Sequence, residues 1–319
     1  MKKLLLATTA LALSAGLAHA QGVTINGNGR MGLVYTRTAA GVSTTVMENR
    51  LRLQFNVAIE ADHGLTFGAF VRTQSGMNNG LAYAGALASS RVWVESNGLR
   101  LTFGNQDGAI QTRLVGAQTV GYTGGTFNGS SAGMFSIPQG QASNGNPLLP
   151  GTPGPNQRVA VAYEANGYYV HVSHDRSMGA ISAATEIAVG GTFGQFSVML
   201  GHATRTGYGV YAPDSDVTTL AGAYNGGSWG VSAIVARLGA GVNPVTGANT
   251  NWLIGGNVAL GGGTLNGYVG RSYDNDPATN DNTYGLGYSY GLGGGARVAA
   301  GIERTNDATR AEVGVAFNF

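Results

Sequence analysis

Apolar and polar residues alternate with a period of two along most of this chain. The clearest example is the C-terminal segment, where Ala311, Val313, Val315, Phe317 and Phe319 alternate with small or polar residues. A period of two is typical of a β-strand whose two faces meet different surroundings. The pattern therefore predicts an all-β protein.

Short turns punctuate the alternating segments. Asn-Gly and Gly-Gly pairs favour the two-residue turns of β-hairpins. Seven tight turns are predicted at Asp62-His63-Gly64, Ser96-Asn97-Gly98, Ala165-Asn166-Gly167, Phe193-Gly194, Asn225-Gly226-Gly227, Gly261-Gly262-Gly263 and Gly293-Gly294-Gly295. With longer polar connections between the hairpins, about sixteen strands are expected, starting near Val23, Thr44, Gly64, Tyr83, Gly98, Gln157, Tyr168, Ala183, Gln195, Asp216, Ser228, Thr250, Gly263, Asn282, Gly295 and Thr309.

Composition changes the picture from a soluble sheet protein to a membrane barrel. Only 11% of the residues are charged, whereas roughly 25% is usual for soluble domains. No apolar run after Gln21 is long enough for a transmembrane helix. The prediction is a transmembrane antiparallel β-barrel, closed because a bilayer tolerates no open sheet edge.

The first twenty residues predict export. Lys2 and Lys3 precede an apolar run, and Ala18-His19-Ala20 fits the small-x-small cleavage rule. We expect residues 1–20 to be a cleaved signal peptide and residues 21–319 to be a single barrel domain. The chain has no cysteine, so neither disulfides nor thiolate sites are expected.

The basic residues of the predicted barrel are all arginines. Residues 21–319 carry 16 arginines and 16 acids, a neutral balance that argues against a nucleic-acid partner. Strand alternation puts five arginines on the polar face of the first four strands, most of them near mid-height: Arg30, Arg50, Arg52, Arg72 and Arg91. An alternative interpretation treats them as ordinary solvated residues.

One connection, residues 107–156, is far longer than the others and lacks clean alternation. Long loops in compact domains are usually functional or disordered, and a barrel of sixteen strands has room inside for such a loop. This third loop is predicted to fold inward and narrow the lumen. Between positions 108 and 157 it contains no acid and one arginine, Arg113, with Asp107 at its root.

Several stretches resemble the general-diffusion porins of Gram-negative bacteria, especially the sixteen-stranded α-proteobacterial type. They run from Val23 to Gly32, from Asn49 to Leu53, from Gly64 to Ala69 and from Asn97 to Asn105. The resemblance implies an outer-membrane homotrimer among lipid and lipopolysaccharide, each subunit with a water-filled channel for small hydrophilic solutes. It also implies a constriction between the third loop and the basic cluster, here Arg30, Arg50, Arg52, Arg72, Arg91, Asp107 and Arg113.

The third loop departs from the family's pattern, in which several carboxylates face the arginines. Because only Asp107 is available as an acid here, the arginines are expected to be unpaired. Unpaired arginines at a narrow aqueous site attract anions and repel cations. A weak to moderate anion preference is therefore predicted.

The sequence gives little support for a nucleotide, metal or cofactor site. Gly27-Asn28-Gly29-Arg30-Met31-Gly32 matches a dinucleotide motif, but it is predicted to lie in a strand rather than before a helix. His171 and His174 would face opposite sides of a strand. No cofactor is expected, although the acids of two predicted loops are candidate Ca²⁺ ligands, with solvated loop charges as the alternative: Asp214 and Asp216 in one loop, and Asp274, Asp276 and Asp281 in the other.

Two rival functions were weighed against the general pore. A barrel enzyme needs a nucleophile and base in contact, and no such pairing is visible, so no enzymatic activity is expected. A substrate-specific channel needs a dedicated binding cluster, whereas Tyr122, Phe127 and Phe135 in the third loop are few and dispersed. General diffusion is the favoured interpretation.

Overall fold

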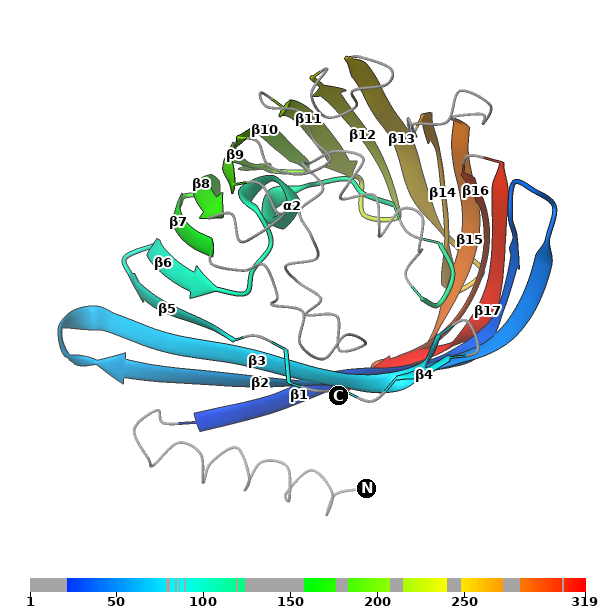
Figure 1. Ribbon diagram of the computed structural model, residues 1–319, viewed down its shortest axis with the longest axis horizontal. Helices are drawn as coiled ribbons and strands as arrows, with labels where there is room; N and C mark the ends of the chain where they lie inside the picture. Colours follow the sequence, from blue (N-terminus) through cyan, green and yellow to red (C-terminus); the bar gives the residue numbers. More distant parts are fainter. Residues whose placement is uncertain are drawn as a thin grey trace.

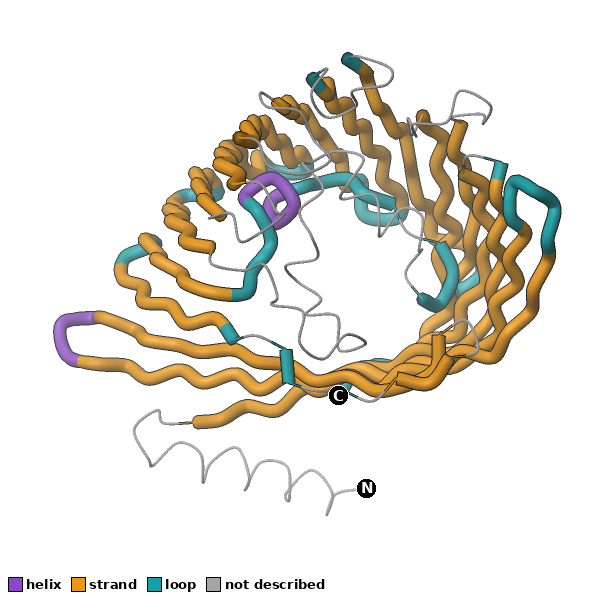
Figure 2. The backbone as a smooth tube through the Cα atoms, viewed as in Figure 1, coloured by secondary structure: helices purple, strands orange, loops and turns teal. Residues whose placement is uncertain are grey.

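A computed structural model describes residues 22–78, 81–83, 85, 87–88, 90–118, 120–123, 158–175, 183–206, 215–239, 248–271, 282–305 and 307–319. These residues form a large antiparallel β-sheet that curves round on itself (Figures 1 and 2). A five-residue helix, α2 (Ala109–Arg113), lies inside the curve, and a 3₁₀ turn, η1 (Asp62–Gly64), joins two strands.

The described strands are, in chain order, β1 (Gly22–Arg37), β2 (Ser43–Ala61), β3 (Leu65–Asn78), β4 (Leu81–Tyr83), β5 (Arg91–Ser96), β6 (Leu99–Gly104), β7 (Arg158–Ala165), β8 (Tyr168–Asp175), β9 (Ala183–Phe193), β10 (Phe196–Thr206), β11 (Ser215–Asn225), β12 (Trp229–Leu238), β13 (Asn249–Leu260), β14 (Gly263–Arg271), β15 (Asn282–Gly293), β16 (Ala296–Thr305) and β17 (Ala308–Asn318).

The sheet closes into a barrel because β1 pairs with both β2 and β17. In the last of these pairings Asn28 lies opposite Asn318 and Arg37 lies opposite Thr309. The described segments fill sixteen strand positions, since β4 and β5 lie along the same edge of β3. The predicted sixteen-stranded antiparallel barrel is confirmed.

Strand boundaries follow the turn chemistry. Asn97 and Gly98 both have positive φ, as do Asn166 and Gly167, which is the geometry of the type I′ turns that such pairs favour. Most strands begin within a residue of their predicted start. The fourth differs, because the strand expected to run on from Tyr83 is interrupted and resumes as β5 at Arg91.

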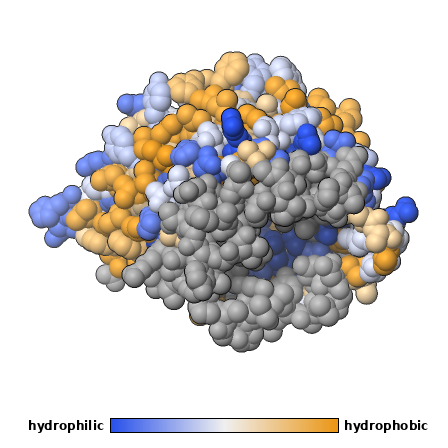
Figure 3. All heavy atoms as spheres, turned by 45° about the horizontal axis from the view of Figure 1, so that its top comes forward, coloured by the Kyte–Doolittle hydropathy of each residue, from blue (hydrophilic) through white to orange (hydrophobic). Residues whose placement is uncertain are grey.

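The two faces of each strand are inverted relative to those of a soluble protein. Along β12, exposed outward residues such as Trp229 and Val231 alternate with buried inward ones such as Ser232. In β17, Val313 is 49% exposed while Glu312 is buried. Figure 3 shows apolar residues gathered on the outer wall and hydrophilic ones lining a hollow within. Such a surface suits lipid outside and water inside.

The strands settle the interpretation of the glycine motif. Residues Gly27 to Gly32 lie within β1, so the motif opens no helix. Polar contacts also join the inner faces of neighbouring strands: Tyr268 of β14 is buried there and donates a hydrogen bond to Glu303.

Among the described residues, no helix is long and apolar enough to cross a membrane.

Candidate functional site

Arginines line one side of the barrel's inner face. Arg30 on β1 lies directly opposite Arg50 on β2, and Arg52, Arg72 and Arg91 follow across β2, β3 and β5. Like charges placed directly opposite each other in a sheet destabilise it. The neighbours of these arginines must therefore offset the repulsion.

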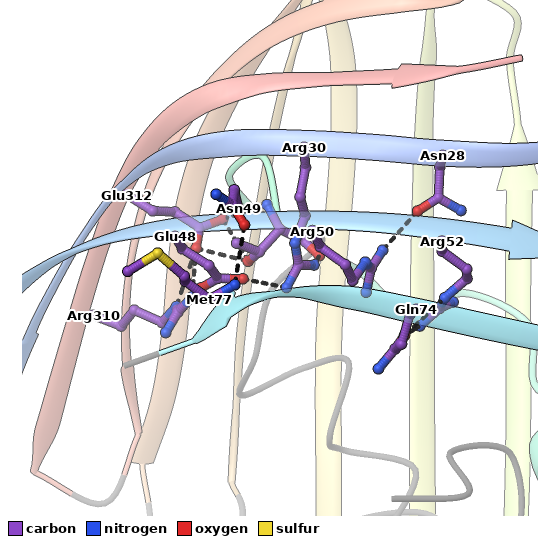
Figure 4. A network of polar contacts seen from close by, with 11 residues as sticks. Asn28, Arg30, Glu48, Asn49, Arg50, Arg52, Gln74, Met77, Arg310 and Glu312 are labelled. Atoms are coloured by element: carbon purple, nitrogen blue, oxygen red, sulfur yellow. Dashed lines mark hydrogen bonds and ion pairs between the residues drawn. The ribbon is translucent and has the colours of Figure 1, made fainter. Parts of the chain in front are cut away.

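Carboxylates on the same wall do so for Arg30. Its guanidinium forms an ion pair with Glu48 of β2, and it donates a hydrogen bond to the Thr123 carbonyl at 2.9 Å. Arg310 of β17 approaches Glu48 at 3.5 Å and Glu312 at 3.0 Å. Figure 4 shows these side chains meeting where β17, β1 and β2 lie side by side.

Amide side chains orient the next two arginines. Arg50 donates to the Asn28 side-chain oxygen at 2.9 Å. Arg52 donates from both Nε and Nη2 to Gln74, at 3.0 and 2.8 Å. A neutral amide fixes the direction of a guanidinium without cancelling its charge (Figure 4).

Arg72, Arg91 and Asp107 share a smaller recess of about 380 Å³, which Phe70 and Asn105 also line. The Arg91 guanidinium lies over the Phe70 ring, 4.2 Å from its centroid. Asp107, at the root of the third loop, lines the same recess, and its negative charge attracts both arginines.

Arg113 is placed differently from the other predicted constriction residues. It ends α2, pairs with Glu164 of β7 and lies 4.6 Å from the centroid of the Tyr169 ring on β8. It lines a larger recess, of about 750 Å³, together with Arg91 and Asp107. Of the seven predicted residues, Arg91 and Asp107 thus line both recesses, Arg72 lines only the smaller one and Arg113 only the larger one.

The described part of the third loop, residues 107–118 and 120–123, lies against the inner wall (Figure 1). At its root the Ala109 and Ile110 amides donate to Ser173 and Glu186, at 3.0 and 2.9 Å. At its far end the Thr123 amide donates to Glu312 at 2.9 Å. The inward direction predicted for this loop is confirmed for these residues, while 124–156 lie outside the described ones.

An apolar cluster lies on the wall beneath this loop segment. Ile110 is fully buried and fits against Gly201, where an added Cβ would lie only 2.7 Å from the Ile110 side chain. The segment covers a cluster of inward-facing residues from β9 to β14, namely Ala188, Met199, Ala203, Val217, Ala221, Ile234, Ala236, Leu238, Leu253 and Tyr268. The described part of the loop therefore covers this apolar cluster.

Tyr122 fixes the far end of the loop segment beside the barrel's closing seam. Its ring lies against Gly32 and Gly314, where an added Cβ would approach within 2.7 Å. Burial, reinforced by Glu48 and Glu312, raises the pKa of its hydroxyl above the ordinary value. Glycine at both wall positions makes the hollow that this ring fills.

The expectation that the arginines are unpaired is wrong for Arg30 and Arg113. The reason is that their partners, Glu48 and Glu164, lie on strands rather than in the third loop. Their positions carry a readable signal, since each lies on the inward face by the period-two rule. What the sequence did not give is the partner that each acid meets.

The remaining candidate ligands do not form a site in the described residues. His171 is buried on the inner face of β8, whereas His174 is exposed and contacts Thr185, so the two face opposite sides as predicted. Within the described ranges no three potential metal ligands cluster together. Four of the acids suggested for Ca²⁺ lie outside those ranges, at positions 214, 274, 276 and 281.

Comparison with known proteins gives concordant matches. Residues 7–310 match the family model described as Gram-negative porin. The chain is 28% identical to a porin of Fuscovulum blasticum and 27% identical to one of Rhodobacter capsulatus, in each case over 93% of this chain and the full length of the relative. A triple mutant of the Rhodopseudomonas blastica porin superposes with a TM-score of 0.72 at 25% identity, over 93% of this chain and all of that one.

Proposed function

This chain belongs to the Gram-negative porin family, and from that premise we propose that its channel weakly prefers anions. Membership makes it an outer-membrane β-barrel porin, a non-enzymatic channel through which solutes pass. Family membership does not say whether the channel passes anions or cations more readily, and the proposal concerns this ion selectivity.

The distribution of charge on the inner wall carries this proposal. On strands β1 to β6 the inward face holds three acids, Glu48, Glu60 and Glu95, against six arginines: Arg30, Arg50, Arg52, Arg72, Arg91 and Arg100. On the described strands β11 to β13 the inward face holds no charged residue. A wall with surplus positive charge raises the local concentration of anions.

The preference is expected to be weak because part of the positive charge is neutralised. Glu48 faces both Arg30 and Arg310, and Asp107 faces Arg72 and Arg91. The six arginines still outnumber the four acids Glu48, Glu60, Glu95 and Asp107, and Arg50, Arg52 and Arg72 lie on β2 and β3 between Arg30 and Arg91. We place the constriction where these residues face the third loop, with Arg30, Arg91, Asp107 and Arg113 at its margins.

The first prediction is that the zero-current potential in a salt gradient has the sign expected of an anion-selective channel. Purified protein in a planar bilayer, with KCl concentrations differing tenfold across the membrane, is expected to pass Cl⁻ more readily than K⁺. Replacing three wall arginines together (Arg50→Gln, Arg52→Gln, Arg72→Gln) should abolish or reverse the preference, because three positive charges leave the lumen.

The matched control removes three arginines whose strand positions face outward (Arg237→Gln, Arg271→Gln, Arg304→Gln). It changes net charge equally and should leave the potential near the wild-type value. A wild-type channel that prefers K⁺ would overturn the proposal.

Family resemblance also supports a homotrimer in contact with lipopolysaccharide, with residues 1–20 removed on export and 21–319 forming the barrel. We expect detergent-extracted protein to have a trimeric mass by light scattering. N-terminal sequencing of the exported protein should begin at Gln21. A monomeric mass, or a mature chain that retains Lys2 and Lys3, would contradict the respective expectation.

A further inference from the structure

The larger recess lies between the inner wall of β5 to β8 and helix α2. Its volume is about 750 Å³, and it reaches the tight turn at Gly98. Its floor on β7 is made of two small residues, Ala160 and Ala162. In the sheet register Ala162 lies between Arg100 of β6 and His171 of β8, so two large polar side chains flank a shallow floor.

Three guanidinium groups line this recess, and each lies over an aromatic ring. Arg91 is 4.2 Å from the Phe70 ring centroid and Arg100 is 5.4 Å from that of Trp93. Arg113, on the opposite side, is 4.6 Å from the centroid of Tyr169. Stacking immobilises a guanidinium plane and leaves its edge of N–H groups for bidentate contact with a carboxylate.

Three carboxylates, Glu95, Asp107 and Glu164, also line this recess, and they leave part of the hydrogen-bonding capacity of its cations unused. Glu95 takes Nε and one terminal nitrogen of Arg100, and Glu164 takes one terminal nitrogen of Arg113. Arg113 Nε is buried without a hydrogen-bond partner. For Arg91 the described residues supply the Phe70 ring and the field of Asp107 but no hydrogen-bond acceptor.

A buried imidazole adds an independent sign of a missing partner. His171 is 5% exposed, lines the same recess, and its Nδ1 meets no hydrogen-bonding atom in the described part of the chain. Leaving a buried polar atom unpaired costs free energy that a polar atom of a bound ligand would restore. The unpartnered nitrogens of Arg113 and His171 therefore mark this recess as a place where a polar ligand gains hydrogen bonds.

We propose that this recess is a saturable binding site for small organic anions that carry two carboxylates. One carboxylate meets Arg91 and Arg100 on the strand wall, and the other meets Arg113 on α2. A monocarboxylate can contact only one of these two sets of arginines at a time, and a neutral sugar has no charge to pair with either set. The inference rests on the proposed anion-preferring pore and adds to it the class of solute that binds inside the channel.

The test measures single-channel KCl conductance during addition of succinate, with acetate and glucose as comparison solutes. Succinate should reduce the conductance with saturation, and its half-saturating concentration should be at least about tenfold below that of acetate. Glucose should show no saturable effect. The variants Arg91→Gln and Arg113→Gln should each raise the half-saturating concentration of succinate by about tenfold or more.

A variant that keeps every charge separates binding from general electrostatics. Ala162→Leu fills the floor and should remove the succinate effect while leaving the zero-current potential in KCl unchanged. Arg304→Gln, which removes a charge paired with Asp307 at the far end of β16, should leave the succinate effect intact. Heat-resistant migration on gels confirms that each variant is folded.

The outcomes distinguish this inference from the proposed function. A Cl⁻-preferring channel whose conductance changes linearly with succinate, or equally in wild type and Ala162→Leu, overturns the binding site alone. A K⁺-preferring channel that still saturates with succinate overturns the anion preference alone.

Discussion

At the scale of single residues, the lumen is organised by carboxylates that each serve more than one cation or amide. Glu48 is only 3% exposed and faces Arg30 and Arg310. Glu312 accepts hydrogen bonds from the Thr123 amide and hydroxyl, and also pairs with Arg310. These acids set both the net charge of the wall and the position of the loop.

Glu48→Gln is expected to increase the anion preference. The substitution keeps the shape of the side chain and removes the negative charge facing two arginines. Its hydrogen bonds to charged groups weaken, so the free energy of unfolding in detergent should fall by about 1.5–3 kcal/mol. The measurements are the zero-current potential in a KCl gradient and a denaturant titration.

Asp307→Asn is the control for Glu48→Gln, because it removes an acid paired with Arg304 away from this cluster. If both variants shifted the potential equally, Glu48 would have no special part in selectivity.

At the scale of elements, α2 holds the loop against the wall from within. Ala109 and Ile110 are fully buried against β9 and β10, whereas Gln111 and Thr112 are exposed and line the larger recess inside the barrel. A buried ion pair between Arg158 and Asp175, at 2.9 Å, supports the loop's root through a hydrogen bond from Arg158 to the Gln106 carbonyl. A helix this short owes its position to these contacts rather than to its own stability.

Ile110→Ala is expected to loosen the loop and increase open-channel current noise. Removing a buried Ile side chain typically costs about 2–5 kcal/mol, and here the loss falls on the contact between loop and wall. Noise spectra from single channels give the readout. Gln111→Ala, one position along on the exposed side of α2, should resemble wild type, and equal noise in both variants would contradict the anchoring role.

At the scale of the whole molecule, the barrel has two unlike inner sides. Arginines occupy the side formed by β1 to β6, and the apolar side of β9 to β14 lies beneath the third loop. One side of the lumen therefore carries surplus positive charge, and the other carries an apolar cluster covered by the described part of the third loop. This asymmetry, rather than any single residue, is the basis of the proposed anion preference.

The anion preference is expected to weaken as salt rises. The Debye length falls from about 10 Å at 0.1 M to about 3 Å at 1 M, so wall charges are screened from ions passing along the axis. Zero-current potentials measured at a fixed tenfold ratio and increasing mean KCl concentration should approach zero. A preference independent of salt would point to selection by size and dehydration instead.

The sequence by itself determined the strands, their turns and the face on which each residue lies. These features are local, because alternation reports the two environments of a strand and Asn97-Gly98 or Gly261-Gly262 has the positive φ that a tight turn requires. The interruption before Arg91 was missed because β4 is only three residues long and a pattern that short carries little information. Arg50 and Arg52 were correctly assigned to the inner face for the same local reason.

Only the tertiary structure decided which inward residues meet. Glu48 contacts Arg310 because closure of the barrel brings β17 against β1, which itself pairs with β2. The loop's attachment at Glu186 and Glu312 depends on the curvature of the whole wall, to which no local pattern refers. Alternation thus fixed which side of the sheet each charge occupies, and closure of the barrel fixed its partner.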